Sequence, residues 1–131
     1  MEKILNSSKN ILLVCPFVSL KGEIYFNRFR YLALNLTKIG YNVTLVTSDF
    51  EHFSKSFRGD ATTYNEGYEI VLIKETGYNK NVELKRIYSH YNFCKNLDKY
   101  LESLQYKPDL IYSAYPLICS NLILGKYKDK N

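Results

Sequence analysis

Ile11-Leu12-Leu13-Val14-Cys15 opens the stretch of sequence that decides the fold, and Val43-Thr44-Leu45-Val46-Thr47 closes it. The first segment is apolar without alternation, which is typical of a strand covered on both faces. Apolar residues then recur every three or four positions from Phe29 to Leu36, and Gly40 stands where a left-handed helix end belongs. The stretch therefore predicts a βαβ unit, whose parallel strands need covering layers on both faces of their sheet.

The rest of the chain adds two predicted strands and two predicted helices. The strands are residues 68–73 and 110–112. Between them, apolar residues at helical spacing predict a long helix over about residues 81–105, with Asn81 as its N-cap. A last helix is predicted over residues 117–124, just after a proline that suits a first helical turn.

These elements predict an α/β fold in which residues 1–131 form a single domain. Right-handed crossovers place about four parallel strands in the order 3-2-1-4, in a three-layer, Rossmann-like arrangement. The direction of winding reverses between the first and fourth strands. A ligand crevice is therefore expected between residues 17–22 and residues 113–116, at the carboxyl ends of the strands.

The composition is that of a soluble globular protein with an excess of positive charge. Of the 131 residues, 46% are hydrophobic and 24% are charged, and the formal net charge is +5. This charge suits an anionic partner: a phosphorylated substrate, an acidic membrane surface or nucleic acid. Thirteen tyrosines suit either half-buried packing or contacts to a sugar, a nucleotide or a headgroup. No apolar run is long enough for a membrane span, so we expect a cytoplasmic protein whose contact with the inner membrane, if any, is peripheral.

Three cysteines, Cys15, Cys94 and Cys119, are far apart in largely apolar surroundings. An odd number at such spacings predicts buried, reduced thiols rather than a disulfide framework or a zinc site. No histidine pair has metal-ligand spacing, and the glycine patterns of dinucleotide and P-loop sites are missing from the loop after the first strand. We therefore expect no metal and no cofactor.

Two loops carry candidate binding residues. Lys21 and Gly22 precede the first helix, where backbone N–H groups and the helix dipole favour an anion. Gly22 is equally well explained as a loop glycine with positive φ, and Lys21 as a solvated side chain. Residues 48–67 have no clean period, which is typical of a functional or mobile loop. Within them, Lys55 and Arg58 alternate with aromatic residues, a mixture that suits a phosphorylated glycan or single-stranded nucleic acid, or simply an anchored loop.

His90 lies at the edge of the apolar stripe of the long helix, near Lys80 and Arg86. A histidine in this position is commonly a hydrogen-bonded structural residue. It could instead face the crevice and bind phosphate or transfer a proton, with Lys80 and Arg86 supplying positive charge. His90 is therefore a candidate for a catalytic role, and no Ser-His-Asp or paired-carboxylate arrangement accompanies it.

Several segments, taken in order, form a familiar pattern: Arg30-Tyr31-Leu32-Ala33, Gly40-Tyr41-Asn42-Val43-Thr44-Leu45-Val46-Thr47, Ser48-Asp49-Phe50, Arg86-Ile87-Tyr88-Ser89-His90 and Lys107-Pro108-Asp109-Leu110-Ile111-Tyr112. This order resembles the opening of family-4, GT-B-fold glycosyltransferases, in a bacterial branch that builds surface polysaccharide such as capsule. The resemblance covers nearly the whole chain. It implies an incomplete amino-terminal domain of such an enzyme, the half that mainly binds the acceptor. The carboxyl-terminal half, with its E-x(7)-E donor signature, is not in the sequence.

The resemblance implies that the full enzyme transfers a sugar from a nucleotide-sugar to a lipid-linked or polysaccharide acceptor. This chain alone would be inactive, because the donor binds the other domain. Two residues depart from the family pattern: Glu23 follows Gly22 where a second glycine is common, and Tyr115 stands where some relatives have histidine. The substrate-binding candidates are Lys21, Gly22, Lys55, Arg58, Lys80, Arg86, Tyr112 and Tyr115.

Other functions remain open from the sequence. The chain could be a stand-alone Rossmann-like module that binds a nucleotide or a protein partner without catalysis. Binding of nucleic acid through the basic, aromatic residues 52–58 is the least favoured, and we expect no nucleic-acid partner. A homodimer through an open sheet edge is also compatible with the predicted fold.

Overall fold

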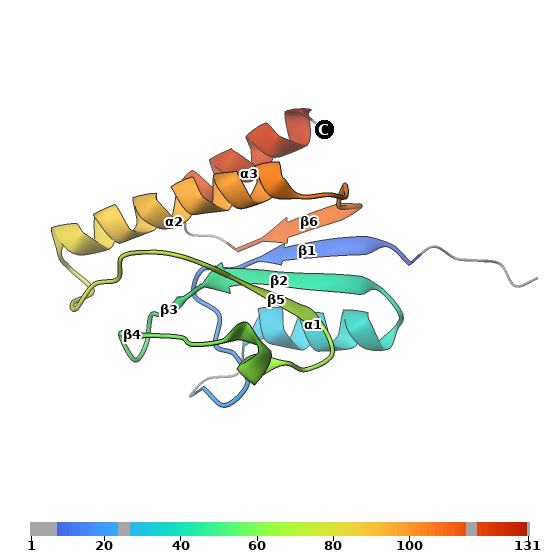
Figure 1. Ribbon diagram of the computed structural model, residues 1–131, viewed down its shortest axis with the longest axis horizontal. Coiled ribbons are helices and arrows are strands. Elements are labelled where there is room, and N and C mark those ends of the chain that lie inside the picture. Colours follow the sequence, from blue (N-terminus) through green and yellow to red (C-terminus); the bar gives the residue numbers. More distant parts are fainter. Residues whose placement is uncertain (1–7, 24–26, 115–117, 131) are drawn as a thin grey trace, which may run out of the picture.

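The computed structural model describes residues 8–23, 27–114 and 118–130, in which strands and helices alternate (Figure 1). None of the helices in these ranges is both long and apolar enough to cross a lipid bilayer. In chain order the elements are β1 (Asn10–Val14), α1 (Arg28–Lys38), β2 (Asn42–Ser48), β3 (Phe50–Glu51), β4 (Ser56–Phe57), the 3-10 helix η1 (Ala61–Tyr64), β5 (Glu69–Ile73), α2 (Leu84–Ser103), β6 (Leu110–Ser113) and α3 (Ile118–Lys130).

The main sheet has four parallel strands in the order β5-β2-β1-β6. Counted by themselves in chain order, these are the third, second, first and fourth strands of that sheet. The labels differ from the expected numbering because β3 and β4 form a separate antiparallel pair, which the sequence did not predict. Each of these two strands has two residues, too short to give a periodic signal in the sequence.

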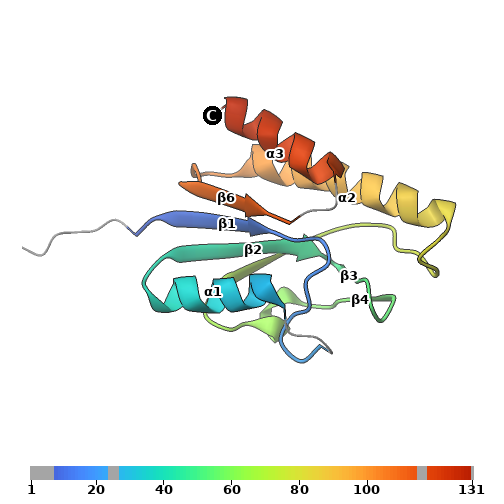
Figure 2. The ribbon, with the colours of Figure 1, turned by 180° about the vertical axis from the view of Figure 1, so that it is seen from behind.

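Helices cover both faces of the main sheet, with α1 on one face and α2 and α3 on the other (Figures 1 and 2). The side chains of β1 alternate between two cores. Leu13 packs in one core with Phe29 of α1, whereas Leu12 packs in the other with Phe93 and Leu97 of α2. This double burial explains why β1 is apolar without alternation, and the predicted three-layer α/β architecture is present.

The helix ends differ from the predicted ends by a few residues. Asn27 caps α1, because its side-chain oxygen accepts hydrogen bonds from the backbone N–H groups of Phe29 and Arg30, at 3.1 and 3.2 Å. For α2 the predicted cap Asn81 is wrong, since the N-cap is Glu83. The Glu83 carboxylate closes the preceding turn by accepting hydrogen bonds from backbone N–H groups of residues 79 and 80, so the helix begins only at Leu84.

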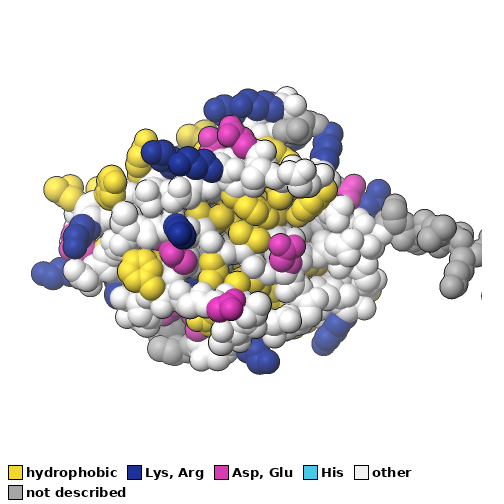
Figure 3. Space-filling model, viewed as in Figure 1, with side chains coloured by type: hydrophobic (Ala, Val, Ile, Leu, Met, Phe, Trp, Pro, Cys, Tyr) yellow, Lys and Arg dark blue, Asp and Glu magenta, His cyan; other side chains and the backbone are white. Residues whose placement is uncertain are grey.

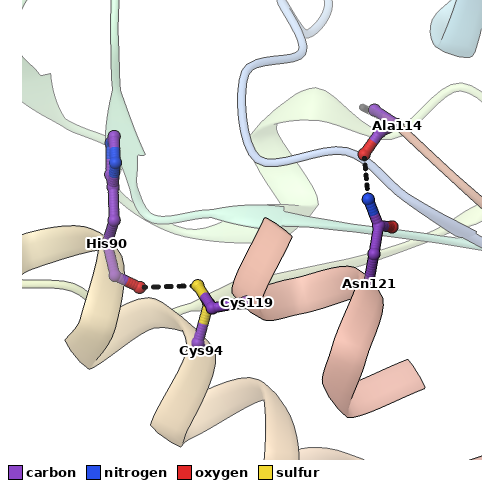
Figure 4. The surroundings of a disulfide bond; sticks show 5 residues. All are labelled: His90, Cys94, Ala114, Cys119 and Asn121. Carbon is purple, nitrogen blue, oxygen red and sulfur yellow. Dashed lines mark hydrogen bonds between the residues drawn. A yellow bond between two sulfur atoms is a disulfide. The ribbon is translucent and has the colours of Figure 1, made fainter. Parts of the chain in front are cut away.

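A disulfide bond joins Cys94 of α2 to Cys119 of α3, which corrects the expectation of three reduced thiols (Figure 4). The two Cα atoms lie 6.2 Å apart although 25 positions separate them in the sequence. The two helices pack side by side on one face of the sheet. The spacing of the two cysteines in the sequence does not predict that contact. Cys15 is the free cysteine; it is buried, and this burial raises the pKa of its thiol to about 11.

Candidate functional site

The loops that follow β1, β2 and β5 meet at the carboxyl edge of the main sheet, beside the beginning of α2 (Figure 1). Four rings gather there. Phe17 from the loop after β1 lies 5.0 Å from the His52 ring and 5.4 Å from the His90 ring, between centroids. Tyr78 from the loop after β5 lies 5.8 Å from His52 and 5.6 Å from His90. A hydrogen bond joins His52 Nδ1 to the Tyr78 hydroxyl. We call Phe17, His52, Tyr78, Arg86 and His90 the carboxyl-edge cluster.

Two cations lie over the Tyr78 ring of this cluster. The Arg86 guanidinium carbon is 5.8 Å from the ring centroid, and the Lys55 Nζ is 5.5 Å from it. Both distances are within the range of a cation–π contact. Arg86 also donates from Nη1 to the Asn81 carbonyl oxygen at 2.6 Å, and Lys55 donates to the His52 carbonyl oxygen. The cluster therefore combines aromatic faces with positive charge.

The two histidines of the cluster are held in their neutral forms at pH 7. Burial, with the nearby charge of Arg86 and the neighbouring His52, lowers the pKa of His90 from 6.5 to about 4. Burial and the charges of Lys55 and Arg86 also lower the pKa of His52, although Glu51 opposes this shift. Neutral imidazoles can both donate and accept hydrogen bonds, so each ring can bind a polar ligand.

Two buried nitrogen atoms of the cluster have no hydrogen-bond partner within the described part of the chain. These are Nε of Arg86 and Nε2 of His90. Buried polar atoms normally have a hydrogen-bond partner, so two nitrogen atoms without one in the same cluster need an explanation. Both residues line a cleft of about 580 Å³, whose other lining residues are Asn81, Val82, Glu83, Leu84 and Ile87. The unpaired atoms and the cleft together mark this edge as the candidate binding site.

A buried carboxylate holds the loop that carries Tyr78. Glu75 is 8% exposed and accepts hydrogen bonds from the hydroxyl groups of Ser48, at the end of β2, and Ser89, in α2. The Ser89 hydroxyl in turn accepts a hydrogen bond from the backbone N–H of Gly77 at 2.8 Å. Burial raises the pKa of Glu75. Gly77 has a φ of +81°, and a Cβ there would lie 2.9 Å from the Phe57 ring, so only glycine fits beside Tyr78.

Arg58 lies at the same edge but is used inside the protein. Its side chain is 2% exposed and forms an ion pair with Glu23, with N–O distances of 2.6 and 2.8 Å. It also donates to the carbonyl oxygens of Val18 at 2.6 Å and Ser48 at 2.8 Å. These bonds tie the loop after β1 to the end of β2. Glu23 thus has a structural role, since its carboxylate balances the Arg58 charge.

The remaining predicted site residues lie in different places. Lys21 and Lys80 are exposed, and Gly22 has the positive φ, +86°, expected of a loop glycine. Tyr112 stacks on Phe29 at 5.4 Å, between ring centroids. Phe29 belongs to the core on the α1 side, whereas the cluster lies beside α2. Tyr115 lies outside the described residues, so the proximity of Gly22 to Tyr115 that the crevice requires stays a prediction.

Of the sequence candidates, the fold brings together Lys55, Arg86 and His90. It adds Phe17 and Tyr78, which sequence reasoning did not choose as site residues. Both residues follow a strand of the main sheet at its carboxyl end, and that position was a usable signal. Within the described residues, no group of three His, Cys, Asp or Glu side chains could hold a metal ion.

Comparison with known proteins assigns the chain to no family. No family model matches the sequence, and no curated protein matches it at a significant level.

Proposed function

We propose that this domain binds an anionic carbohydrate at the carboxyl-edge cluster, as the acceptor-binding part of a glycosyltransferase of surface-polysaccharide synthesis. The observation that carries the proposal is the pair of unpartnered nitrogens, Arg86 Nε and His90 Nε2, on two residues that line one cleft. A modest rotation of either side chain toward the cleft would let a ligand oxygen replace the missing partner. The desolvation cost of that atom, about 1–3 kcal/mol, would then be offset.

The remaining members of the site suit a sugar that carries a phosphate. Phe17, which is partly exposed, offers a ring of the kind on which a pyranose can stack, while Lys55 and Arg86, held over the buried Tyr78 ring, supply positive charge. The neutral imidazole of His90 can hydrogen-bond a sugar hydroxyl, or act as a proton acceptor for one. The acceptor role and the enzyme class rest on the resemblance to family-4 glycosyltransferases. The anionic carbohydrate rests on the cluster itself.

Titration with glucose 1-phosphate, followed by the NMR signals of His52 and His90, tests the proposal. We expect both rings to shift, with glucose itself binding at least about tenfold more weakly, because a charge-assisted hydrogen bond contributes about 1.5–3 kcal/mol. Arg86→Gln should weaken binding of the phosphate by a similar factor. Lys85→Gln, which removes an exposed cation from the same helix, should change it little. Equal loss in both variants would mean that only the overall charge matters.

Nucleotide binding and sugar transfer distinguish this proposal from its main alternative, a nucleotide-binding module. Uridine diphosphate that binds this chain tightly, at the same two histidines, would favour a nucleotide-binding module over an acceptor domain. Transfer of sugar from a nucleotide-sugar by these 131 residues alone would contradict the acceptor-only role. We expect neither result.

A further inference from the structure

A polar cleft of about 510 Å³ lies at the amino edge of the main sheet, at the other end of the strands from the carboxyl-edge cluster. Its lining includes Asn10, Asn42 and Glu69, which are the first residues of β1, β2 and β5 (Figure 1). Tyr106 joins them from the segment between α2 and β6. The volume is in the range of small-molecule sites. We call this space the amino-edge cleft.

Three oxygen atoms of the lining come close together. The Thr44 hydroxyl lies 3.5 Å from Oε2 of Glu69 and 3.4 Å from the hydroxyl oxygen of Tyr106. Thr44 is opposite Glu69 in the register of β2 and β5, so the sheet itself fixes their approach. Hydrogen bonds between hydroxyl groups are usually about 2.7–2.8 Å long. Thr44 is only 5% exposed, so a buried hydroxyl has two long contacts and no short one within the described residues.

The amino-edge cleft carries negative charge in a protein whose formal net charge is +5. Glu69 is the charged residue among its described lining residues, and no described residue forms an ion pair with it. Lys9, next to Asn10, lies 3.9 Å from the Asp109 carboxylate instead. In Figure 3 the surface at the end where β1 and β2 begin is mostly white, the colour of backbone and uncharged polar side chains. A cation entering the cleft therefore meets a carboxylate that has no partner, whereas an anion is repelled.

We propose that the amino-edge cleft binds a small primary amine. An ammonium group has three N–H donors and no acceptor, and the oxygens of Thr44, Glu69 and Tyr106 can each accept one hydrogen bond. Bonds from an ammonium to oxygen are about 2.7–2.9 Å long, and they replace the two long contacts of the Thr44 hydroxyl. A hydroxyl group in the same place has a single proton to donate, and a quaternary ammonium has none.

The rest of the cleft indicates what kind of molecule carries the ammonium group. A bond of 3.3 Å joins the amides of Asn42 and Asn10, and each amide has further donor and acceptor positions for a ligand. Tyr41, another lining residue, is 38% exposed and offers a ring with a polar tip. Gly40 has a φ of +102°, and a Cβ there would meet no atom within 4 Å, so the cleft is open on that side. This lining suits an amine whose body carries hydroxyl or amide groups rather than a hydrocarbon chain.

The inference goes beyond the carbohydrate proposal and does not depend on it. The seven residues of β2 separate the two edges of the sheet by about 20 Å, at about 3.3 Å per residue, so no small ligand contacts both sites. The two sites also differ in charge, since Lys55 and Arg86 belong to one and Glu69 to the other. Amine binding is read at Thr44 and Glu69, and sugar-phosphate binding at the two histidines. Failure of either proposal therefore leaves the other standing.

NMR titration of the whole chain at pH 7 with three related probes tests the inference. We expect ethanolamine, a primary ammonium with one hydroxyl, to give saturable shifts of the backbone amide signals of Thr44 and Glu69 at millimolar concentration. Choline keeps the charge without N–H donors, and N-acetylethanolamine keeps the hydroxyl without the charge. Both should bind at least about tenfold more weakly, because a hydrogen bond from a charged group is lost in each case.

Variants of the cleft provide the second half of the test. Glu69→Gln should weaken ethanolamine binding at least about tenfold, and Thr44→Val, which keeps the shape of the side chain and removes the hydroxyl, at least about threefold. Asp129→Asn and Thr63→Val are the matched controls, since both change exposed residues far along the chain from the cleft lining and should leave binding unaltered. Circular dichroism confirms that each variant is folded.

Three results would overturn the inference. The first is an absence of saturable shifts with ethanolamine. The second is binding of choline or N-acetylethanolamine as tight as that of ethanolamine, which would mean that the three oxygens do not hold an ammonium group. The third is an equal loss of binding in Glu69→Gln and Asp129→Asn, which would mean that only the overall charge of the protein matters.

Discussion

At the scale of single residues, two arginines at the same edge of the sheet have opposite roles. Arg58 is paired with Glu23 and bonded to two carbonyl oxygens, so its charge and donors are satisfied within the protein. Arg86 has one bond to a carbonyl oxygen, a cation–π contact and an unpaired Nε. The first therefore stabilises the fold, and the second is the one that we propose for ligand binding. From the sequence alone, both arginines were predicted to be positively charged binding residues.

Replacement of Arg58 by glutamine should lower the free energy of unfolding by about 3–5 kcal/mol. The change leaves the Glu23 carboxylate and the carbonyl oxygens of Val18 and Ser48 without their partner in a buried place. Urea unfolding followed by circular dichroism measures the loss. Lys21→Gln is the matched control, since it removes an exposed cation from the loop that Arg58 contacts and should change stability by less than about 0.5 kcal/mol. A loss below about 1 kcal/mol for Arg58→Gln would show that its bonds contribute little.

The pKa of His90 is a second residue-scale prediction. NMR titration should give a pKa near 4 for this ring, and Arg86→Gln should raise it, because burial and the Arg86 charge both disfavour the imidazolium. Lys85→Gln should leave it unchanged. A bound phosphate should raise the same pKa by stabilising the charged form. Titration near 6.5 in the free protein would mean that the ring is solvated.

This low pKa also makes stability depend on pH. The unfolded chain has an ordinary histidine pKa of about 6.5 and therefore binds more protons than the folded chain at pH values between 6.5 and 4. The free energy of unfolding should accordingly fall as the pH is lowered through that window, and should be unaffected above it. The pKa of Glu75 is raised in the folded protein, so its effect on the free energy of unfolding changes with pH in the opposite direction. Comparison with His90→Gln isolates the histidine part, about 1 kcal/mol for a half-buried ring.

At the scale of elements, the disulfide fixes how α2 and α3 lie on the sheet (Figure 4). In Figure 4 the His90 ring points away from the bond, and the Cys119 Sγ lies 3.9 Å from the His90 carbonyl oxygen. A disulfide sulfur carries no proton, so this is a packing contact. Cys94 therefore lies one turn of α2 from His90, a member of the carboxyl-edge cluster. The disulfide bond restrains the backbone that carries His90.

Loss of the disulfide should destabilise the protein by about 3 kcal/mol. Closing a loop of 25 residues restricts the unfolded chain, and Cys94→Ser with Cys119→Ser removes that restriction. Urea unfolding without reductant measures the difference. The bond itself is checked by alkylation in denaturant without reductant, followed by mass spectrometry. One thiol, Cys15, should react before reduction and three after it, and none should react in Cys15→Ser before reduction.

At the scale of the whole molecule, the sequence was informative where burial imposes a pattern. The apolar β1, the spacing of α1 and α2 and the position of Gly40 predicted a parallel sheet with helices on both faces. They also predicted a ligand site at the carboxyl edge, which stays a prediction. Contacts between distant segments leave no such pattern. The Cys94–Cys119 bond, the short β3–β4 pair and the pairing of Arg58 with Glu23 all depend on how loops and helices meet in space. Those same contacts decide which predicted charges remain available at the site.

The two cores of this molecule should contribute independently to a single unfolding transition. Ile11 belongs to the core under α1 and Ile73 to the core under α2, with β2 between their strands. Ile11→Val and Ile73→Val should each cost about 1 kcal/mol, and the double variant should cost their sum within about 0.5 kcal/mol. Val43 lies directly opposite Ile11 in the same core, so Ile11→Val combined with Val43→Ala should depart from additivity. Urea unfolding measures all of these changes in the free energy of unfolding. We expect its slope against urea concentration to be the same in every variant. Two separate transitions would mean that the two layers do not unfold as one unit. Strong coupling between Ile11 and Ile73 would mean that the two cores do not contribute independently.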